Sequence, residues 1–214
     1  MHNLLLIGGG GHSGVVAETA LALDKYHLIS HLDDNPKAEL MGNKPIGQIK
    51  LIEDKKTLEL YKNAFVAIGE AKMRVKLIDY VKKYKYNLAT LIHPKATVST
   101  SALIGEGTTV FAGSVIQANV RIGDGAIINT SSSIDHDCFI SSGAHICPGV
   151  HLGGNVYIGK NTWIGIGTVI KQNCKVGSNV LIGAGSVVIN DIEDNMVAFG
   201  VPAKPQNNKY YSKI

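Results

Sequence analysis

The sequence predicts an α/β domain with a Rossmann-like βαβ unit over residues 1–90, followed by a parallel β-helix of hexapeptide repeats over residues 91–214. Two observations lead to this prediction. An aliphatic residue recurs at every sixth position from Val98 to Val188, sixteen times without an insertion. The chain before this stretch lacks the period and instead joins short apolar runs to glycine turns and helical patterns.

The six-residue period fits neither an α-helix, with 3.6 residues per turn, nor an isolated strand, with two. It is typical of a parallel β-helix, in which each short strand forms one side of a coil. Three hexads make a three-sided coil, so sixteen hexads give about five coils and a prism ~25 Å tall at the usual strand spacing. Residues eighteen positions apart are therefore expected to stack.

The other positions of the hexad support this interpretation. The residue two positions before each aliphatic is small or β-branched, as Cys138 and Cys174 are small, which suits an inward corner. The residue directly after the aliphatic is often glycine, as at Gly123 and Gly165. We expect these glycines to supply the positive φ of a sharp turn. Aromatic residues make up 6% of the chain, which fits a thin interior filled by Ile and Val.

The N-terminal unit is predicted from apolar runs that end in small or acidic residues. Leu4–Ile7 leads into Gly8–Gly11 and a helical pattern, and a second strand ends in Asp33 and Asp34. A third strand, residues 65–68, precedes Gly69 and another helical pattern. Parallel sheets bind ligands at the carboxyl ends of their strands. The candidate binding residues at those ends are Gly10, Gly11, His12, Asp33, Asp34 and Gly69.

The glycine turn also matches the dinucleotide fingerprint, with Gly9, Gly11 and Gly14 in the required spacing and Asp33 beyond them. However, the unit is about half the size of a full dinucleotide-binding domain, and one βαβ unit can hold a single nucleotide. We therefore expect a nucleotide-sugar rather than NAD. Free N–H groups of the turn and the helix N-terminus would meet its phosphates, with His12 beside them.

Composition excludes several classes of partner. The net charge of +4 is spread along the chain, which argues against nucleic acid as a partner. The three cysteines cannot all pair and have no zinc-finger spacing, which favours a reducing compartment. The apolar run Leu4–Ile7 is too short for a signal peptide or a membrane span. We expect a soluble cytoplasmic protein without a membrane partner.

Several motifs recur together along the chain: Gly-Gly-His-Ser-Gly from Gly10, Leu32-Asp33-Asp34, Ile68-Gly69, Asn129-Thr130-Ser131-Ser132, Asp135-His136-Asp137-Cys138 and Gly-Val-Pro-Ala-Lys from Gly200. This set resembles the nucleotide-sugar acetyltransferases of bacterial glycan biosynthesis. The resemblance is closest to the UDP-4-amino-sugar N-acetyltransferases of bacillosamine biosynthesis, with sialic acid O-acetyltransferases as relatives. It implies a left-handed β-helix, a homotrimer with the active site at the subunit interface, acetyl-CoA as co-substrate and no metal.

His136 and Asp137 are the candidate catalytic residues. By hexad phase His136 lies outside the coil, between two acidic neighbours. A neutral imidazole can take a proton from an attacking amine, and a carboxylate can orient the ring and raise its basicity. The resemblance implies that His136 is the general base and Asp137 its partner, at a position where the resembling motif has Glu.

The resemblance also implies the acetyl-CoA contacts. His145 lies outside the coil by phase and would meet the coenzyme at the thioester carbonyl, with Trp163 one coil further on the same face. Ile166 and Ala184 are eighteen positions apart and stack with Pro148 in a column along which the pantetheine arm would lie. The candidates for its phosphates are Lys160, Lys171 and Lys204.

We therefore expect an acetyl-CoA-dependent N-acetyltransferase that acts on the amino group of a nucleotide-linked 4-amino sugar, UDP-linked by resemblance, through direct attack of the amine on the thioester. O-acetylation of a sugar such as sialic acid needs the same base and stays an alternative. Two alternatives are more remote. A metal-dependent β-helix enzyme would use His136, His145 and His151, whose spacing differs from that of the β-helical carbonic anhydrases. A non-catalytic scaffold would need neither the glycine turn nor the His–Asp pair.

Overall fold

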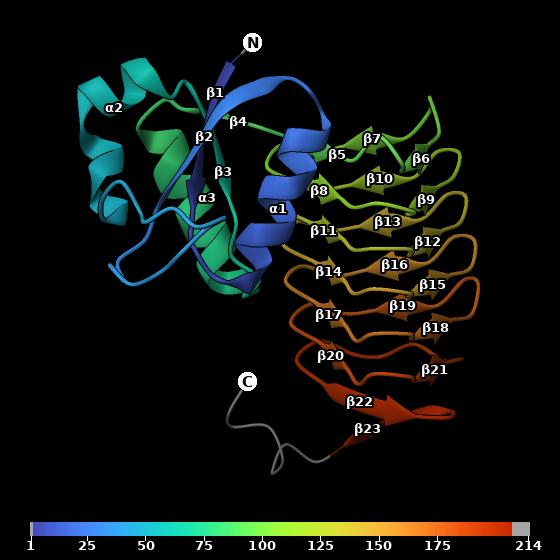
Figure 1. Cartoon of the computed structure of the whole chain (residues 1–214). Coiled ribbons are helices and arrows are strands. Elements are labelled where there is room, and N and C mark those ends of the chain that lie inside the picture. The colour runs from blue at the N-terminus through green and yellow to red at the C-terminus, as the bar shows by residue number, and fades with distance from the viewer. Residues whose placement is uncertain (1, 207–214) are drawn as a thin grey trace. The chain divides into compact units, whose positions relative to one another are not determined.

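The computed structural model describes residues 2–206 (Figure 1). The chain divides between Pro94 and Lys95 into two compact units, which are described separately. Within the described residues, no helix is long and apolar enough to cross a membrane.

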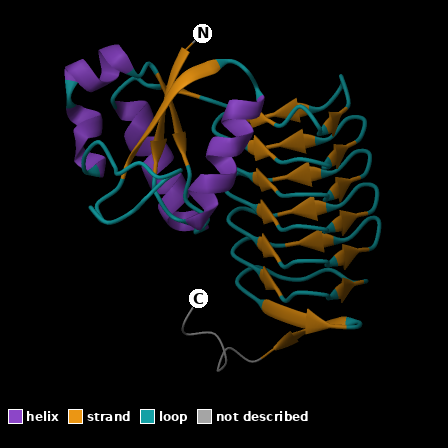
Figure 2. Cartoon of the chain, viewed as in Figure 1, coloured by secondary structure: helices purple, strands orange, loops and turns teal. Residues whose placement is uncertain are grey.

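The N-terminal unit contains a parallel sheet of four strands in the order β2-β1-β3-β4, with helices on both sides of it (Figure 2). The parallel pairing follows from the helical crossovers between successive strands. The strands are β1 (His2–Ile7), β2 (Tyr26–Leu32), β3 (Asn63–Val66) and β4 (Asn87–Leu88), with β5 (Leu91–Ile92) at the end of the unit. The helices are α1 (Gly11–Ala22), η1 (Ile49–Glu53), α2 (Lys55–Leu60) and α3 (Ala71–Lys83).

Burial of both sheet faces explains the unbroken apolar run of β1. All four residues of Leu4–Ile7 have no exposed surface, as expected for a strand covered on both faces. Leu5 and Ile7 belong to one core cluster with Leu77 and Ile78 of α3. The carboxyl ends of β1, β2 and β3 therefore meet at one edge, which positions the glycine turn, Asp33 and Gly69.

The C-terminal unit is a parallel β-helix of two-residue strands (Figure 1). From β6 to β21 each pairing joins residues eighteen apart, for example His145 with Trp163 and Ile146 with Ile164. One face holds β6 (Thr97–Val98), β9 (Val115–Ile116), β12 (Ser133–Ile134), β15 (His151–Leu152), β18 (Val169–Ile170) and β21 (Val187–Val188). A second face holds β7 (Leu103–Ile104), β10 (Arg121–Ile122), β13 (Phe139–Ile140), β16 (Tyr157–Ile158) and β19 (Lys175–Val176).

The third face holds β8 (Thr109–Val110), β11 (Ile127–Ile128), β14 (His145–Ile146), β17 (Trp163–Ile164) and β20 (Leu181–Ile182). It ends in the antiparallel pair β22 (Val197–Gly200) and β23 (Ala203–Gln206), which lies beyond the end of the six-residue period. The aliphatic residue is the second of each two-residue strand and points inward. Ile146, Ile164 and Ile182 are fully buried, so a column of stacked aliphatic side chains forms the core.

The expectation about the turn glycines is wrong. Positive φ occurs three positions after the aliphatic residue, at Gly125, Gly143 and Asp137 among others. The glycines directly after the aliphatic residue meet a different requirement, close approach of the next coil. A Cβ at Gly123 would lie 2.6 Å from the backbone nitrogen of Ser142, and one at Gly165 would lie 2.6 Å from the carbonyl oxygen of Ile182.

Candidate active site

The turn between β12 and β13 holds the His136–Asp137 pair. The two side chains meet directly, with 2.7 Å between Nδ1 of His136 and Oδ2 of Asp137. Asp135 accepts a bond from the backbone N–H of His136 at 2.8 Å and shapes the same turn. Asp137 has φ 59, a left-handed conformation that Asp adopts more readily than most residues. The contact therefore forms between sequence neighbours within one turn.

The acidic turn makes the imidazole more basic. The bond to Asp137 raises the pKa of His136 above its ordinary value, and the charge of Asp135 raises it further. The bonds from His136 and Asn119 lower the pKa of the Asp137 carboxyl, which stays ionised. When the ring is neutral and Nδ1 donates to Asp137, the lone pair lies on Nε2. Because the His136 side chain is 60% exposed, that nitrogen can accept a proton from a bound molecule.

Hollows lie on both sides of the pair. One, of ≈ 330 Å³, is lined by His136 together with Asp135, Gly153, Gly154, Asn155, Gln172 and Asn173. The other, of ≈ 540 Å³, is lined by Asp137 together with Ser101, Leu103, Asn119, Arg121, Cys138 and Phe139. The site therefore has room for a reactant within reach of the imidazole.

His145 differs from its expected exposure. Its side chain leaves the coil, as the hexad phase predicts, but only 5% of the residue is exposed. Its Nε2 lies 3.1 Å from Nδ2 of Asn129, and its ring centroid lies 4.2 Å from that of Trp163 on the next coil. His145 is thus a packed residue of this face rather than a freely exposed imidazole.

Pro148, Ile166 and Ala184 form a stacked column at the corner that links β14, β17 and β20 to the following strands. Gly167 N–H donates to the Pro148 carbonyl at 3.0 Å, and Gly185 N–H donates to that of Ile166 at 2.8 Å. Ile166 is 60% exposed and Ala184 is also exposed. This corner is not the one that carries His136, so a single chain does not bring the two groups together on one edge.

The glycine turn of the N-terminal unit has fewer free N–H groups than expected. Gly8 N–H donates to the Leu32 carbonyl at 2.8 Å, and Gly9 N–H donates to Oδ2 of Asp33 at 2.7 Å. The second oxygen of Asp33 accepts from Asn35 N–H at 2.8 Å. The expectation that the whole turn presents free N–H groups is therefore wrong, because Asp33 holds the turn closed against β2. Cβ atoms at Gly10 and Gly11 would meet no atom within 4 Å, so the surface there is open.

The two other acidic and glycine positions are held by backbone contacts. Oδ1 of Asp34 accepts from Ile49 N–H at the start of η1, at 3.0 Å. Gly69 lies three residues after β3. Its carbonyl accepts from Nη1 of Arg74, which also donates to the Ile68 carbonyl at 2.9 Å. Both positions flank the glycine turn and fix the strand ends around it.

Arg74 is a residue that the sequence analysis missed. It is fully buried, and burial lowers the pKa of its guanidinium to about 10. Burial, together with the positive charge of Arg74, lowers the pKa of His12 to about 4, so His12 is neutral at pH 7. The sequence did contain a signal for its burial. Arg74 precedes Leu77 by three positions and Ile78 by four, so it lies on the apolar face of the predicted helix.

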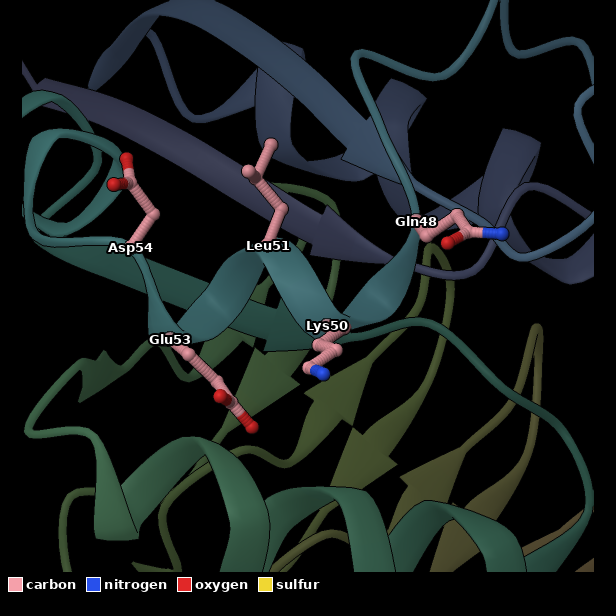
Figure 3. Close-up of a pocket in the computed structure, with 5 residues that line it drawn as sticks. All are labelled: Gln48, Lys50, Leu51, Glu53 and Asp54. Carbon is pink, nitrogen blue, oxygen red and sulfur yellow. The ribbon is translucent and has the colours of Figure 1, made fainter.

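A separate hollow beside η1, of ≈ 450 Å³, is lined by Gln48, Lys50, Leu51, Glu53 and Asp54 (Figure 3). Lys50 and Glu53 extend from the same side of η1, away from Leu51 (Figure 3). Glu53 accepts a bond from the Tyr80 hydroxyl at 2.7 Å. None of the predicted site residues lines this hollow.

Across residues 2–206, no group of three or more His, Cys, Asp or Glu side chains is placed to hold a metal ion. His151 instead bonds through Nδ1 to the Ser133 hydroxyl at 2.7 Å. The three cysteines are free thiols, all of them buried.

Comparison with known proteins identifies both units. A family model described as the PglD N-terminal domain matches residues 3–81, and the bacterial transferase hexapeptide model matches residues 155–190. UDP-N-acetylbacillosamine N-acetyltransferase of Bacillus subtilis (strain 168) is 36% identical over 114 residues, which are 52% of this chain and 52% of that protein. The match thus spans about half the length of this curated relative.

Solved structures match over nearly the whole chain. The acetyltransferase domain of PglB from Neisseria gonorrhoeae FA1090 is 42% identical, with a TM-score of 0.92 over 96% of this chain and 100% of that one. The same domain is also known in complex with acetyl coenzyme A. PerB from Caulobacter crescentus, in complex with CoA and GDP-perosamine, is 35% identical, with a TM-score of 0.92 over 97% of this chain and 98% of that one.

Proposed function

Because this chain belongs to the family of sugar N-acetyltransferases that join a PglD N-terminal domain to a left-handed hexapeptide-repeat β-helix, we propose that it transfers the acetyl group of acetyl-CoA to the amino group of a nucleotide-linked 4-amino sugar. The observation that carries the proposal is the exposed imidazole of His136, bonded through Nδ1 to Asp137. The relatives are N-acetyltransferases by name, which favours an amine over a hydroxyl as acceptor.

His136 acts as the general base in this proposal. The amine nitrogen attacks the thioester carbonyl carbon, and Nε2 of His136 takes the proton that the nitrogen loses. The carbonyl oxygen carries the negative charge of the tetrahedral intermediate until the C–S bond breaks. The imidazolium then returns its proton to the CoA sulfur, and Asp137 stabilises the charged ring between the two steps.

The acetyl-CoA contacts are assigned to His145, Ile166 and Ala184. The exposed column of Ile166 and Ala184 offers an apolar strip on which a pantetheine arm can lie. The role of His145 in contacting acetyl-CoA rests on the resemblance alone, because the ring is packed between Asn129 and Trp163. CoA and acetyl-CoA bind to relatives of this fold, and no metal is required by the mechanism.

The nucleotide-sugar is assigned to Gly10, Gly11, His12, Asp33, Asp34 and Gly69. The bare backbone at Gly10 and Gly11 lets a phosphate approach the N-terminus of α1. Neutral His12 can exchange hydrogen bonds with the sugar or phosphate but adds no positive charge. Asp33 shapes the turn through Gly9. The relatives differ in their nucleotide, with UDP named for one and GDP for another.

A homotrimer with its active site between subunits completes the proposal. His136 and the Ile166–Ala184 column occupy different corners of one β-helix, so a reaction that uses both needs a second copy of the chain. A cyclic arrangement of three copies gives each site the same pair of corners. Buried free thiols and the use of acetyl-CoA support a cytoplasmic location.

The test is an assay of free CoA release from acetyl-CoA with UDP- and GDP-linked 4-amino sugars, their 4-hydroxy counterparts and sialic acid. We expect release with an amino sugar, and a product acetylated at nitrogen by mass spectrometry and NMR. Release of CoA only with hydroxyl acceptors would contradict the proposal and would favour the alternative, O-acetylation of a sugar. Light scattering should give the mass of three chains, and a fully active monomer would exclude the shared site.

A further inference from the structure

Asp137 belongs to a ladder of turn residues that stack at intervals of eighteen. Asn119 lies one coil earlier and also has positive φ, at 60°. Its Nδ2 donates to Oδ1 of Asp137 at 3.1 Å, while its own backbone N–H donates to the Ser101 hydroxyl at 3.0 Å. The two oxygens of Asp137 are therefore divided between two partners, Oδ1 for Asn119 and Oδ2 for His136.

The same ladder contact occurs elsewhere without a carboxylate. Asn155 donates to the amide oxygen of Asn173, eighteen positions later, at 2.9 Å, and Asn179 donates to that of Asn195, sixteen positions later, at 3.1 Å. In those pairs the amides join neighbouring coils. At position 137 a carboxylate takes the place of the accepting amide, so the contact that joins two coils also fixes the rotation of the carboxylate that holds His136.

On the opposite side of His136, the neighbouring coil has a glycine where the other hexads have a side chain. Gly154 lies one coil later, eighteen positions on, and is the one glycine among the sixteen residues that stand two positions after the aliphatic residue of each hexad. A Cβ at Gly154 would lie 2.7 Å from both Cε1 and Nε2 of His136. Its φ is not in the left-handed range, so backbone conformation does not require glycine there. The requirement for glycine comes instead from the space that the imidazole occupies.

We propose that the two coils flanking His136 orient its ring: Asn119 positions Asp137 from one side, and Gly154 leaves the space that the imidazole occupies on the other. Both are positioning residues, because the contacts named here act on the reaction through Asp137 and the imidazole of His136. Together they keep Nδ1 on Asp137 and leave Nε2 open to the hollow lined by Gln172 and Asn173. This inference rests on the proposed role of His136 as the base.

The first test replaces Asn119 by glycine, which removes the donor and tolerates positive φ. Loss of one hydrogen bond to a charged group is expected to lower kcat about tenfold, with the KM for acetyl-CoA unchanged. Nitrogen-15 NMR of the imidazole supplies a readout that mere instability would not move. A neutral histidine without a partner favours the Nε2–H tautomer, whereas the bond to Asp137 favours Nδ1–H, so the variant should shift toward Nε2–H.

Asn179→Gly is the matched control, because Asn179 makes the same ladder contact at the same distance and also has positive φ, at 54°. It should lose a similar amount of stability while kcat and the His136 tautomer stay unchanged. Equal losses of kcat in Asn119→Gly and Asn179→Gly would show that the ladder acts on stability alone and would overturn the role of Asn119.

The second test adds a methyl group with Gly154→Ala. The ring must turn away, so kcat should fall about tenfold to a hundredfold, and the tautomer should again shift toward Nε2–H. In a His136→Ala background the same change should have no further effect on the residual rate, as expected for coupled positions. An unchanged rate and tautomer in Gly154→Ala would overturn the role of Gly154.

The NMR readout separates this inference from the proposed function. If no amino-sugar acceptor is acetylated but both variants shift the tautomer, the function fails and the positioning stands. If the wild-type chain is active and both variants leave tautomer and kcat unchanged, the positioning fails and the function stands.

Discussion

His136 in the β-helix and His12 in the N-terminal unit have opposite environments. His136 is exposed, and the neighbouring Asp137 raises its pKa. His12 is half-buried, and burial with the charge of Arg74 lowers its pKa to about 4. The difference shows that one residue type has two protonation behaviours in this chain: His136 can gain and lose a proton near neutral pH, whereas His12 stays neutral there.

The two environments are also assembled differently. At the β-helix corner the side chains of the pair contact each other or residues eighteen positions away, as with Asn119 and Gly154. At the glycine turn the partners come from separate elements, Asp33 after β2 and Arg74 in α3. A substitution at the corner should therefore act locally on the chemistry, and one at the turn should act on binding.

The largest expected effect is that of His136→Ala. Loss of a general base is expected to lower kcat by a factor of about 10² to 10⁴. Titration calorimetry should show that the variant still binds acetyl-CoA. His12→Ala should instead raise the KM for the nucleotide-sugar and change kcat much less. If His12→Ala proved the more damaging of the two for kcat, the base would have been assigned to the wrong unit.

A reciprocal pair of variants separates the two ligands. Gly11→Val places a side chain in the open space at the start of α1 and should raise the KM for the nucleotide-sugar about tenfold while leaving that for acetyl-CoA unchanged. Ile166→Glu should do the reverse, because it adds a negative charge to the exposed column. Gly165 is unsuitable for this purpose, since any side chain there meets the backbone of the next coil. Effects of both variants on both ligands would refute the division of labour.

A smaller effect is expected for Asp137→Asn. The imidazolium loses its charged partner, so the pKa of His136 falls and the acid limb of the kcat/KM profile moves to lower pH. The plateau rate should fall several-fold because the base is weaker. Asp135→Asn serves as the control and should move the limb less, since its charge is the lesser cause. A limb that moved to higher pH would contradict the assigned contact.

The smallest expected effect concerns stability. His12 has a folded pKa of about 4, below the unfolded value of 6.5, so the unfolded state binds more protons between these values. The free energy of unfolding should therefore fall as pH drops from 6.5 toward 4, by at most about 1.4 kcal/mol per pH unit. Denaturant unfolding of His12→Gln should show a shallower slope.

His136 should show the opposite slope. Its folded pKa is raised, so its contribution is present below the unfolded pKa and is lost as pH rises through the folded one. Exposure of the ring keeps this contribution small. If His12→Gln and His136→Gln changed the pH dependence of the unfolding free energy in the same direction and by the same amount, the contrast between the two regions would be contradicted.

Much of the β-helix followed from periodicity. The unbroken six-residue period predicted short strands and the stacking of Pro148, Ile166 and Ala184, because each coil repeats the geometry of the one before it. The position of positive φ could not be predicted in this way. Glycine serves both a left-handed turn and a close approach, and the sequence does not distinguish Gly125, which has the first role, from Gly123, which has the second.

By itself the sequence determined the order of the two units, the βαβ pattern, the register of the coils and the corner that carries His136 and Asp137, since these depend on neighbours in the chain or on a fixed interval. Tertiary structure alone decided the burial of His145 against Trp163, the closure of Gly9 by Asp33, the buried Arg74 that lowers the pKa of His12, and the space that Gly154 leaves for the imidazole. These features depend on side chains that meet across elements, and hydrophobic periodicity does not specify such distances.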